Sequence, residues 1–583
     1  MSQQDNNRTT GVRRRELLGL GVGATALALT PGSGQAAAGN ALPETWDREV
    51  DVICVGSGAA ACSAAIAAAD AGASVVVLEK LPISGGTTGK SGGVTWIPNH
   101  RFLRARGIED GREDCLRYLA RYAYPGKYTP DSDTLGLSRL EFDLLAAFYD
   151  NGASTIDFLE EVGAASFREF KMWHVDKYAP DYADHLPENK VPRGRALEPA
   201  AGAGSSEGGG SLAAQLAAWL RANDVPILTG HRVSELHMRD GRVIGAAVEH
   251  AGGTLHIRAR RGVVFGTGGF AHNVALSDTH QTFLYGSCAM PGSTGDFIRI
   301  GSSAGAIMGA LHTAWRTQVV VEEALANRSV ALGAFVLPGD SMLVVNKYGQ
   351  RVTNEKRNYN DRTRSHFSYD PTREEYPNQL QFMIFDQRSL DAFAGAYPFP
   401  ANVQESPALI TSDSLTGLTK QIQERLARHA QQIAHVQLSD GFAGTLASSI
   451  DRFNAYAIAG VDEEHQRGQH EYDRDWHGLF SPRNPNTTYA ENPYPNPTMH
   501  PLAASGPYHA FILGAGALDT NGGPLINASA QVLGADGAPI PGLYGAGNCI
   551  ASPTRQAYTG AGGTIGLALT FGNIAGRHVV GKA

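Results

Sequence analysis

A glycine-rich segment near residue 56 has the residue types and the spacing to bind a phosphate-containing cofactor. It runs Gly56-Ser57-Gly58-Ala59-Ala60-Ala61, which is a G-x-G-x-x-A arrangement. Gly56 allows a tight turn, Gly58 lets the backbone approach a pyrophosphate, and Ala61 allows the following helix to pack closely. The N–H groups at the start of that helix would then face the phosphates. The segment therefore predicts binding of a dinucleotide.

The elements on either side of these glycines are those of a Rossmann-type βαβ unit. Residues 50–55 form a short apolar run typical of a buried strand, an alanine-rich helix follows, and residues 74–78 form a second strand that ends at Glu79. An acid at this position accepts hydrogen bonds from the ribose hydroxyls and repels a 2′-phosphate, which disfavours NADP. A lone glycine motif would be weak evidence, and Glu79 alone could be an ordinary strand-end acid. The complete order predicts a dinucleotide fold that begins at Asp51.

Three further glycine clusters are expected at the same edge of the sheet. They are Gly85-Gly86-Thr87-Thr88 with Ser91-Gly92-Gly93 after the second strand, Gly266-Thr267-Gly268-Gly269 after a strand at 262–265, and Gly545-Ala546-Gly547-Asn548 after a strand at 542–544. In an open α/β sheet, ligands bind at the carboxyl ends of the strands. Each cluster alone is as compatible with a plain turn as with a ligand loop. Together they predict one crevice built from distant parts of the chain.

The same clusters divide the chain into two lobes. We expect an α/β fold in which a Rossmann-type cofactor-binding domain at residues 45–324 and 491–583 is interrupted by an inserted α+β substrate (capping) domain at 325–490. A proline-rich stretch at 493–497 marks the return to the cofactor domain.

The composition indicates a globular protein without affinity for polyanions. With 583 residues, 42% of them apolar, the chain is long enough for at least two lobes. Its formal net charge of −8 provides no basic field to attract nucleic acid. The five cysteines have neither metal-ligand nor haem-attachment spacing, so we expect no metal site and no disulfide.

The first 38 residues have the features of an export signal. Arg13, Arg14 and Arg15 precede an apolar run at 17–29, and a small-residue site at 36–38 follows. The run is too short to span a bilayer of about 30 Å, so no stable membrane span is expected. The segment predicts a twin-arginine signal peptide and a periplasmic or otherwise exported protein. The alternative is an uncleaved basic tail on a cytoplasmic protein.

Motifs along nearly the whole remaining chain match a known family. They are Gly85-Gly86-Thr87-Thr88 with Trp96 and Pro98, Thr294-Gly295-Asp296, Val345-Asn346 with Arg351 and Asn354-Glu355, Phe382-Met383-Ile384-Phe385-Asp386, Gly460-Val461-Asp462-Glu463-Glu464, and Gly506-Pro507-Tyr508. On these residues the chain resembles the fumarate reductase-like FAD-dependent oxidoreductases, and most closely the 3-ketosteroid Δ1-dehydrogenases. The resemblance implies an FAD-binding domain with an inserted domain, and a substrate held between them over the flavin.

The cofactor implied by the resemblance is FAD. Related flavoproteins that bond FAD covalently use a histidine near residues 86–91, and this chain has none there, so we expect non-covalent FAD. The positions expected to bind it are Gly56, Ser57, Gly58, Ala59, Ala60, Glu79, Lys80, Gly86, Thr87, Thr88, Ser91, Gly92, Gly93, Thr267, Gly268, Asp296, Gly547, Asn548, Gly563, Thr564 and Ile565.

The resemblance also implies four catalytic positions. Tyr182 follows Pro180-Asp181, Tyr359 follows Asn354-Glu355, and Tyr558 precedes Thr559-Gly560-Ala561-Gly562. Gly562 is the expected backbone donor. The family carries prolines where this chain has Thr559 and Ala561, a change that can reshape the pocket for a different ketone.

These residue types suit the desaturation of a ketone next to its carbonyl. The Tyr558 hydroxyl and the Gly562 N–H would hold the carbonyl oxygen and stabilise the developing enolate. Tyr359 would remove the α-proton, helped by a hydrogen bond from Tyr182, because a phenol with a pKa of about 10 is mostly protonated at neutral pH. The β-hydrogen would leave as hydride to flavin N5. The expected activity is 3-ketosteroid Δ1-dehydrogenase-like, on a steroid or a smaller cyclic ketone, with a quinone or another external electron acceptor.

Two other functions remain open from the sequence. One is an exported flavin reductase of a conjugated enone or an unsaturated carboxylic acid, similar to a fumarate or urocanate reductase. Where fumarate reductases have an arginine and a histidine for the dicarboxylate, this chain has Gly560 and Asp519, although Arg555 could still bind one carboxylate. The other is an electron carrier with a relict site, which would have no need of a base and an oxyanion donor.

Overall fold

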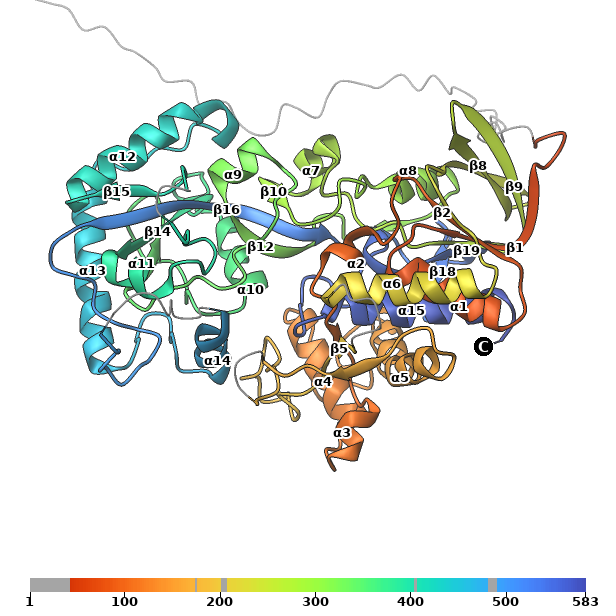
Figure 1. The fold of residues 1–583 in the computed structure, drawn as a ribbon, viewed down its shortest axis with the longest axis horizontal. Helices are drawn as coiled ribbons and strands as arrows, with labels where there is room; N and C mark the ends of the chain where they lie inside the picture. The colour runs from red at the N-terminus through yellow and green to blue at the C-terminus, as the bar shows by residue number, and fades with distance from the viewer. Residues whose placement is uncertain (1–41, 173–175, 201–206, 403–405, 481–489, 583) are drawn as a thin grey trace, which may run out of the picture. The chain divides into compact units, whose positions relative to one another are not determined.

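An eight-stranded sheet carries the cofactor motifs. The computed structural model describes residues 42–172, 176–200, 207–402, 406–480 and 490–582, so the predicted signal peptide at 1–38 lies outside the described residues. The strand order is β18-β19-β9-β1-β2-β6, with β8 beside β9 and β7 beside β8 (Figure 1). The strands are β1 (Arg48–Val55), β2 (Val75–Glu79), β6 (Ile227–Thr229), β7 (Arg232–Arg239), β8 (Arg242–His250), β9 (Gly253–Phe265), β18 (Gln531–Leu533) and β19 (Pro539–Gly545).

The predicted βαβ unit is present at the centre of this sheet. β1 pairs in parallel with β2 and with β9, and β19 pairs in parallel with β9. Val52, Ile53 and Cys54 in β1 are completely buried, as expected for a parallel strand covered on both faces. Helix α1 (Ala59–Asp70) connects β1 to β2. The carboxyl ends of β1, β2, β9 and β19 therefore meet at one edge, where the glycine clusters lie.

Small residues let two helices pack closely beneath this edge. Ten of the twelve residues of α1 are buried, mostly alanine, and α1 packs against the C-terminal helix α15 (Gly563–Val579). The Ser63 hydroxyl of α1 donates to the Leu569 carbonyl of α15 at 2.8 Å. This contact fixes the start of α15, and with it the loop before it, against the cofactor motif.

A second, six-stranded sheet extends away from the first. Its order is β10-β16-β14-β13, and β12 and β15 also pair with β16. The strands are β10 (Gly286–Ser287), β12 (Ala314–Val320), β13 (Met342–Val345), β14 (Leu380–Asp386), β15 (Ile410–Ser412) and β16 (Tyr508–Thr520). The long strand β16 joins the part near the cofactor lobe to the part around β14 (Figure 1). Since β10, β12 and β16 fall outside residues 325–490, the second sheet draws strands from both sides of the predicted boundaries, and the domain division stays a prediction.

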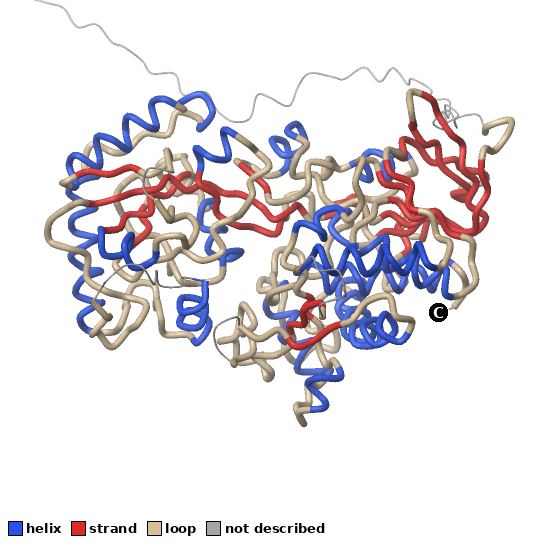
Figure 2. The backbone as a smooth tube through the Cα atoms, in the orientation of Figure 1, coloured by secondary structure: helices blue, strands red, loops and turns tan. Residues whose placement is uncertain are grey.

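The remaining elements complete one unit of residues Pro43–Ala583 (Figure 2). A three-stranded sheet has the order β3-β5-β4, and a two-stranded sheet pairs β11 with β17. Their strands are β3 (Thr95–Trp96), β4 (Phe167–Glu169), β5 (Ala196–Pro199), β11 (Met308–Gly309) and β17 (Gly523–Pro524). The other helices are α2 (Gly86–Lys90), α3 (Arg101–Ala105), α4 (Arg112–Ala123), α5 (Arg139–Glu161), α6 (Gly208–Ala222), α7 (Val274–His280), α8 (Asp296–Ser303), α9 (Val321–Ala326), α10 (Tyr359–Arg364), η1 (Ser365–Phe367), α11 (Gln387–Phe393), α12 (Leu415–Arg428), η3 (Ala430–Ile433), α13 (Phe442–Ala459), α14 (Glu471–Phe480) and η4 (Gly547–Cys549). No helix among the described residues is both long enough and apolar enough to cross a membrane.

Candidate active site and cofactor pocket

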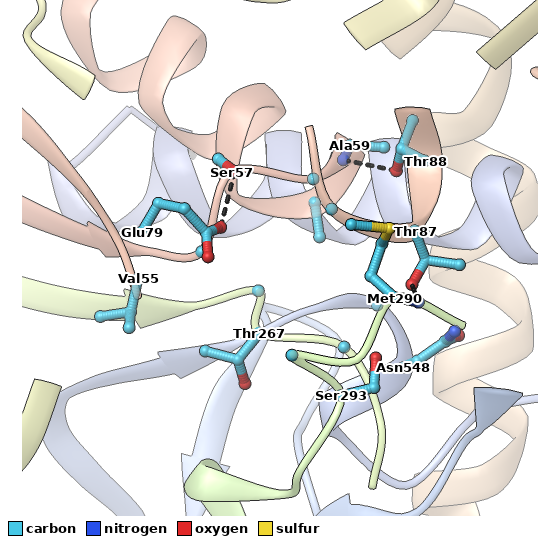
Figure 3. A pocket seen from close by; sticks show the side chains of 18 of the residues that line it. Val55, Ser57, Ala59, Glu79, Thr87, Thr88, Thr267, Met290, Ser293 and Asn548 are labelled. Atoms are coloured by element: carbon cyan, nitrogen blue, oxygen red, sulfur yellow. Dashed lines mark hydrogen bonds between the residues drawn. The ribbon is translucent and has the colours of Figure 1, made fainter. Parts of the chain in front are cut away.

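A pocket of about 1000 Å³, counting its open side, lies at the carboxyl ends of the parallel strands (Figure 3). All the positions predicted to bind the cofactor line it except Gly92, Gly93 and Gly563. Gly93 instead lies against the start of α6, where a Cβ would come within 2.4 Å of the Gly208 carbonyl carbon. Gly563 donates its N–H to the Gly560 carbonyl at 3.0 Å. Gly93 and Gly563 therefore pack against neighbouring backbone outside the pocket lining, whereas nothing lies within 4 Å of a Cβ added at Gly92.

The turn at Gly56 and the start of α1 form the expected phosphate cradle. Gly56 has φ +98°, and a Cβ there would lie 2.5 Å from the Gly266 carbonyl oxygen, so only glycine fits. Gly58, the N-cap residue of α1, has no side chain to cap the first turn. Of the N–H groups there, that of Ala59 donates to the Thr88 hydroxyl at 3.0 Å. A helix start left open in this way suits a phosphate. The cradle fits the pyrophosphate of FAD.

Glu79 is held in a fixed position on the wall of the pocket (Figure 3). Its carboxylate accepts from the Ser57 hydroxyl at 2.6 Å and from the Leu81 N–H at 2.8 Å. The Ser57 hydroxyl in turn accepts from the Gly85 N–H at 2.9 Å. A carboxylate has about four acceptor positions, so Glu79 retains capacity for the ribose hydroxyls.

Lys80 and Asp296 line the pocket as an ion pair. The Lys80 ammonium donates to Asp296 and to the Thr294 hydroxyl, both at 2.6 Å, and Arg232 donates to the other Asp296 oxygen at 2.8 Å. Asp296 is thus shared between two cations of the chain. Asp296 is the first residue of α8, so these two ion pairs help to hold α8 against the pocket wall.

Several residues that line the pocket were not predicted from the sequence. They are Val55, Leu78, Leu81, His231, Arg232, Val233, Phe265, Met290, Gly292, Ser293, Asp519 and Ala568; Gly266, which also lines the pocket, belongs to one of the predicted glycine clusters. Asp519 is completely buried; it accepts from the Gly269 N–H at 2.8 Å and from the Ser293 hydroxyl at 3.2 Å. Burial raises the pKa of Asp519 to about 6. Asp519 could have been predicted from the sequence, because it lies near the carboxyl end of an apolar strand and just before Gly522-Gly523.

The pocket adjoins the residues predicted to be catalytic. Asn548, in the pocket wall, accepts from the Trp315 indole N–H at 2.9 Å. The Trp315 ring lies edge-on to Tyr558, with 5.3 Å between ring centroids. Thr564, also in the pocket wall, follows Gly562 by two residues. The cofactor pocket and the predicted catalytic groups are therefore adjacent.

The three predicted tyrosines, from positions far apart in the chain, lie together and are buried. The Tyr182 and Tyr359 hydroxyls are 2.9 Å apart in a hydrogen bond. The Tyr182 and Tyr558 rings stack at 5.2 Å between centroids, and the Tyr359 and Tyr558 rings meet edge-on at 5.6 Å. We call these three residues the tyrosine cluster.

Backbone contacts from two other segments hold Tyr182 in the cluster. Its N–H donates to the Thr559 carbonyl at 3.0 Å, in the loop that carries Tyr558. Its carbonyl accepts from the Asn358 side chain at 3.2 Å and from Arg357, next to Tyr359. The Tyr182 backbone thus touches the segments that supply the two other tyrosines, which keeps the cluster together.

The residue before Tyr182 anchors the same loop through a buried ion-pair network. Asp181 accepts from the Trp96 indole N–H at 2.7 Å and pairs with Arg195, which also contacts Asp110 at 2.7 Å. Asp181, Arg195 and Asp110 are each about 99% buried. A buried pair of this kind adds little net stability. Without Asp181, Arg195 would remain paired with Asp110, but the buried Trp96 indole N–H and the Asn189 side-chain amide would lose their acceptor.

We therefore expect Asp181→Ala to lower the free energy of unfolding by about 2–5 kcal/mol, the cost of leaving two buried donors without an acceptor, measured by urea denaturation. The matched control is Asp150→Ala, which removes a partner of Arg112 in a pair whose side chains are 49% and 45% exposed and is expected to cost less than about 1 kcal/mol. Equal losses for the two variants would contradict the anchoring role of Asp181.

Tyr359 is positioned at the first residue of α10. The Asn358 side chain caps this helix by accepting from the Asp361 N–H at 2.9 Å. Just before it, Glu355 pairs with Arg351 at 2.8 Å, and Arg351 also contacts Asp462 at 2.8 Å. These buried charges come from the motifs that carry the family resemblance, and they fix the segment that leads to Tyr359.

Gly562 presents a free backbone donor beside the cluster. It has φ +89° and precedes the 17-residue helix α15, whose first turn has no side-chain cap. The Gly562 N–H has no acceptor within the described residues. A Cβ at this position would lie 2.3 Å from the Val94 carbonyl carbon, so a side chain is excluded. The arrangement can place one N–H against a developing oxyanion.

Burial keeps the tyrosines protonated in the resting protein. It raises the pKa of Tyr182 and of Tyr359 well above the usual value of 10, and that of Tyr558 less strongly. For Tyr359 the neighbouring Tyr182 and Tyr558 raise the pKa further. The Tyr558 hydroxyl is therefore available as a hydrogen-bond donor, whereas Tyr359 would act as a base only at an energetic cost.

Most of the chain matches a known protein family. Residues 51–565 match the FAD binding domain family. A 4-oxocyclohexanecarboxylate 2-dehydrogenase of Sinomonas cyclohexanicum is 31% identical, over 91% of this chain and 93% of the relative. A 3-oxosteroid 1-dehydrogenase of Mycolicibacterium smegmatis is 32% identical, over 92% of this chain and 98% of the relative.

Solved structures agree with the sequence relatives. The 3-ketosteroid delta1-dehydrogenase of Sterolibacterium denitrificans, in complex with 1,4-androstadiene-3,17-dione, is 28% identical with a TM-score of 0.74, covering 92% of this chain and all of that one. The open conformation of a flavocytochrome c3 fumarate reductase has the same fold, with a TM-score of 0.60 at 22% identity, over 92% of this chain and 78% of that one.

Proposed function

Because this chain belongs to the FAD binding domain family, among the fumarate reductase-like flavoprotein oxidoreductases, we propose that it introduces a carbon–carbon double bond next to the carbonyl of a cyclic ketone. The observation that carries the proposal is the Tyr182–Tyr359 hydroxyl pair at 2.9 Å, beside Tyr558 and the free Gly562 N–H. A proton acceptor and two oxyanion donors, next to a cofactor pocket, are the groups that ketone desaturation requires.

In this mechanism each chain group has one task. The Tyr558 hydroxyl and the Gly562 N–H bind the carbonyl oxygen and stabilise the negative charge that develops as the α-carbon is deprotonated. Tyr359 acts as its phenolate, which the Tyr182 hydroxyl stabilises by donating to it. Tyr359 Oη then takes the α-proton and becomes a neutral phenol. FAD, when bound non-covalently in the pocket, supplies the acceptor for the hydride that leaves the β-carbon. The residues assigned to these tasks are the four predicted from the family resemblance.

The part of the chain around residues 325–490 is proposed to cap the substrate. Tyr359 comes from this part. Tyr558 and Gly562 come just before helix α15, which packs on α1 beside the cofactor pocket. A substrate gripped by both would be held between the two regions, which excludes water from the reacting carbons. Electrons would then pass to an external acceptor, for which we propose a quinone.

Two classes of ketone are suggested by the relatives. One relative is named for a steroid and the other for 4-oxocyclohexanecarboxylate, a single ring that carries a carboxylate. They differ in size and in charge, so the walls around the tyrosine cluster must favour one of them.

The reverse reaction, reduction of an enone or an unsaturated acid by an exported enzyme, is the alternative. Its main support in the chain is Arg555 as a carboxylate ligand. Arg555 donates to Glu141 at 2.6 Å, so binding a substrate there would require this pair to open. We therefore favour desaturation of a ketone over reduction of an unsaturated acid.

Anaerobic mixing with ketones tests the proposal. The flavin-loaded protein should lose its absorption near 450 nm when mixed with 4-oxocyclohexanecarboxylate, 4-methylcyclohexanone or a 3-ketosteroid, and at least one of them should yield the unsaturated ketone. Reduced protein that is reoxidised by fumarate or another unsaturated acid, with no bleaching by any ketone, would favour the reductase. No flavin response to either kind of compound would contradict both.

The raised pKa of Tyr359 predicts a rate that increases with pH. A base must lose its proton before it can accept another, so below the pKa the active fraction grows about tenfold per pH unit. Single-turnover flavin reduction should therefore rise between pH 6 and 9.5 without reaching a plateau, since burial places the pKa above that range. Flavin content measured at each pH serves as the control. A flat profile would contradict Tyr359 as the base.

A further inference from the structure

A fully buried carboxylate in the cofactor pocket has no task in the proposed mechanism. Asp519, near the end of β16, lines the pocket and is completely buried. No lysine, arginine or histidine of the described residues forms an ion pair with it. A buried carboxylate without a cation is costly unless hydrogen bonds stabilise it, so its contacts decide whether it carries a charge.

Four neutral donors surround the Asp519 carboxylate. Its Oδ2 atom accepts from the Gly269 N–H at 2.8 Å, from the Ser293 hydroxyl at 3.2 Å and from the Asn548 amide at 3.5 Å. Its Oδ1 atom accepts from the Thr520 N–H at 2.9 Å. Hydrogen bonds of this kind favour the ionised form and oppose the effect of burial. The wall of the pocket therefore contains a negative charge that no cation of the chain neutralises.

Asp519 lies at the end of the pocket that would hold the flavin ring. Glu79 marks the adenosine end, and Figure 3 shows Glu79 and Asn548 on different sides of the pocket. Asn548, which donates to Asp519, accepts from the Trp315 indole N–H at 2.9 Å. The Trp315 ring contacts Tyr558 in the tyrosine cluster. Because the hydride passes directly from substrate to flavin, the ring must lie at this end.

The other charged groups of the pocket lie at the adenosine end. The remaining carboxylates, lysines and arginines among the described residues that line it are Glu79, Lys80, Arg232 and Asp296. Lys80 and Arg232 share Asp296, and Glu79 directly precedes Lys80 in the chain. These two anions and two cations balance one another. Of the carboxylates, lysines and arginines among the described lining residues, Asp519 is therefore the one that brings a full charge to the ring end.

We infer that Asp519 lowers the reduction potential of the bound FAD. Two-electron reduction adds negative charge to the flavin ring, and a nearby carboxylate in a pocket that excludes water makes this addition less favourable. The lower potential would favour transfer of electrons from the reduced flavin to the external acceptor. It would also limit how completely a ketone reduces the flavin. The inference depends on FAD binding and goes beyond the choice of ketone.

The potential of an Asp519→Asn protein tests this inference without any ketone. The substitution nearly keeps the shape of the side chain and removes its charge. The potential is measured by slow anaerobic reduction in the presence of a dye of known potential. At about pH 8 the equilibrium should shift about 10- to 100-fold toward reduced flavin, a rise of about 30–60 mV for a two-electron couple. Asp519→Glu, which keeps the charge, should remain closer to the wild type.

The difference between the wild type and Asp519→Asn should disappear in acid. Burial raises the pKa of Asp519 to about 6, so the group is ionised at about pH 8 and largely protonated at about pH 5. The two potentials should therefore converge as the pH falls between these values, whereas a purely structural effect of the substitution would persist. Glu79 and Asp296 are present in both proteins, so their own titration cancels in the difference.

Asp386→Asn is the matched control. Asp386, at the end of β14, is 1% exposed and accepts from the Ser341 hydroxyl at 2.5 Å and from the Ala503 N–H at 2.8 Å. It is thus a second buried carboxylate held by neutral donors, but it is not among the described residues that line the pocket. Its replacement should change the flavin equilibrium less than about twofold, or about 10 mV.

An unchanged or lower potential in Asp519→Asn, or equal shifts in the two variants, would overturn the inference. If Asp519→Asn is purified without flavin, the wild-type protein decides. Its reduction at about pH 6.5 should cause Asp519 to take up a proton, because added negative charge on the flavin raises the pKa of a nearby carboxylate. The redox difference infrared spectrum should then show a new carboxylic acid C=O band. Its absence would also overturn the inference, whether or not a ketone reduces the flavin.

Discussion

Replacing Tyr359 by phenylalanine is expected to slow flavin reduction by a ketone by about 10²–10⁴-fold, the usual contribution of a general base, while the bound flavin is retained. The substitution removes one oxygen atom from a buried side chain and leaves its ring contacts with Tyr182 and Tyr558 in place. The measurement is stopped-flow bleaching under anaerobic conditions, with flavin content taken from the visible spectrum.

Tyr472→Phe is the matched control for this effect. Tyr472 packs against Tyr182 with 5.4 Å between ring centroids, is just as deeply buried, and its hydroxyl has no hydrogen-bond partner among the described residues. Loss of that hydroxyl should change the rate by less than about threefold, or under 1 kcal/mol. A Tyr359→Phe protein that reduces its flavin at the wild-type rate would refute the assignment of the base, as would equal losses in the two variants.

Replacing Gly56 by alanine is expected to abolish FAD retention. The added Cβ would lie 2.5 Å from the Gly266 carbonyl oxygen, so β1 and β9 would have to move apart at the phosphate cradle. The left-handed backbone at φ +98° adds about 1–2 kcal/mol of strain for a residue with a side chain. The purified variant should be colourless, with the ratio of absorbance at 450 nm to that at 280 nm close to zero.

Gly72→Ala separates backbone strain from the clash. Gly72 follows α1 with φ +82°, and nothing lies within 4 Å of an added Cβ. Backbone strain should lower the stability of this variant by a similar amount, about 1–2 kcal/mol, and the variant should keep its flavin. Full flavin occupancy in Gly56→Ala would mean that the turn does not cradle the pyrophosphate.

Local sequence pattern was sufficient for much of the cofactor lobe. The order of apolar strand, glycine turn, small-residue helix and terminal Glu79 predicted β1, α1 and β2, because these elements form through contacts between residues close in the chain. The family motifs likewise named Tyr182, Tyr359, Tyr558 and Gly562, which the structure brings together. Prediction of the domain boundaries had a weaker basis, because β14, from the predicted inserted domain, pairs with β16 of the predicted cofactor domain over a separation of about 130 residues, and no local pattern encodes that pairing.

Tertiary structure alone decided what surrounds these groups. Asp519 reaches the cofactor pocket because β16 ends there, and Asp296 is held by Lys80 and Arg232 from two other segments. The glycine motif and the four positions proposed as catalytic could thus be named from the sequence. Burial and the pairing of charges arise from contacts between distant segments, and these are established only when the chain packs.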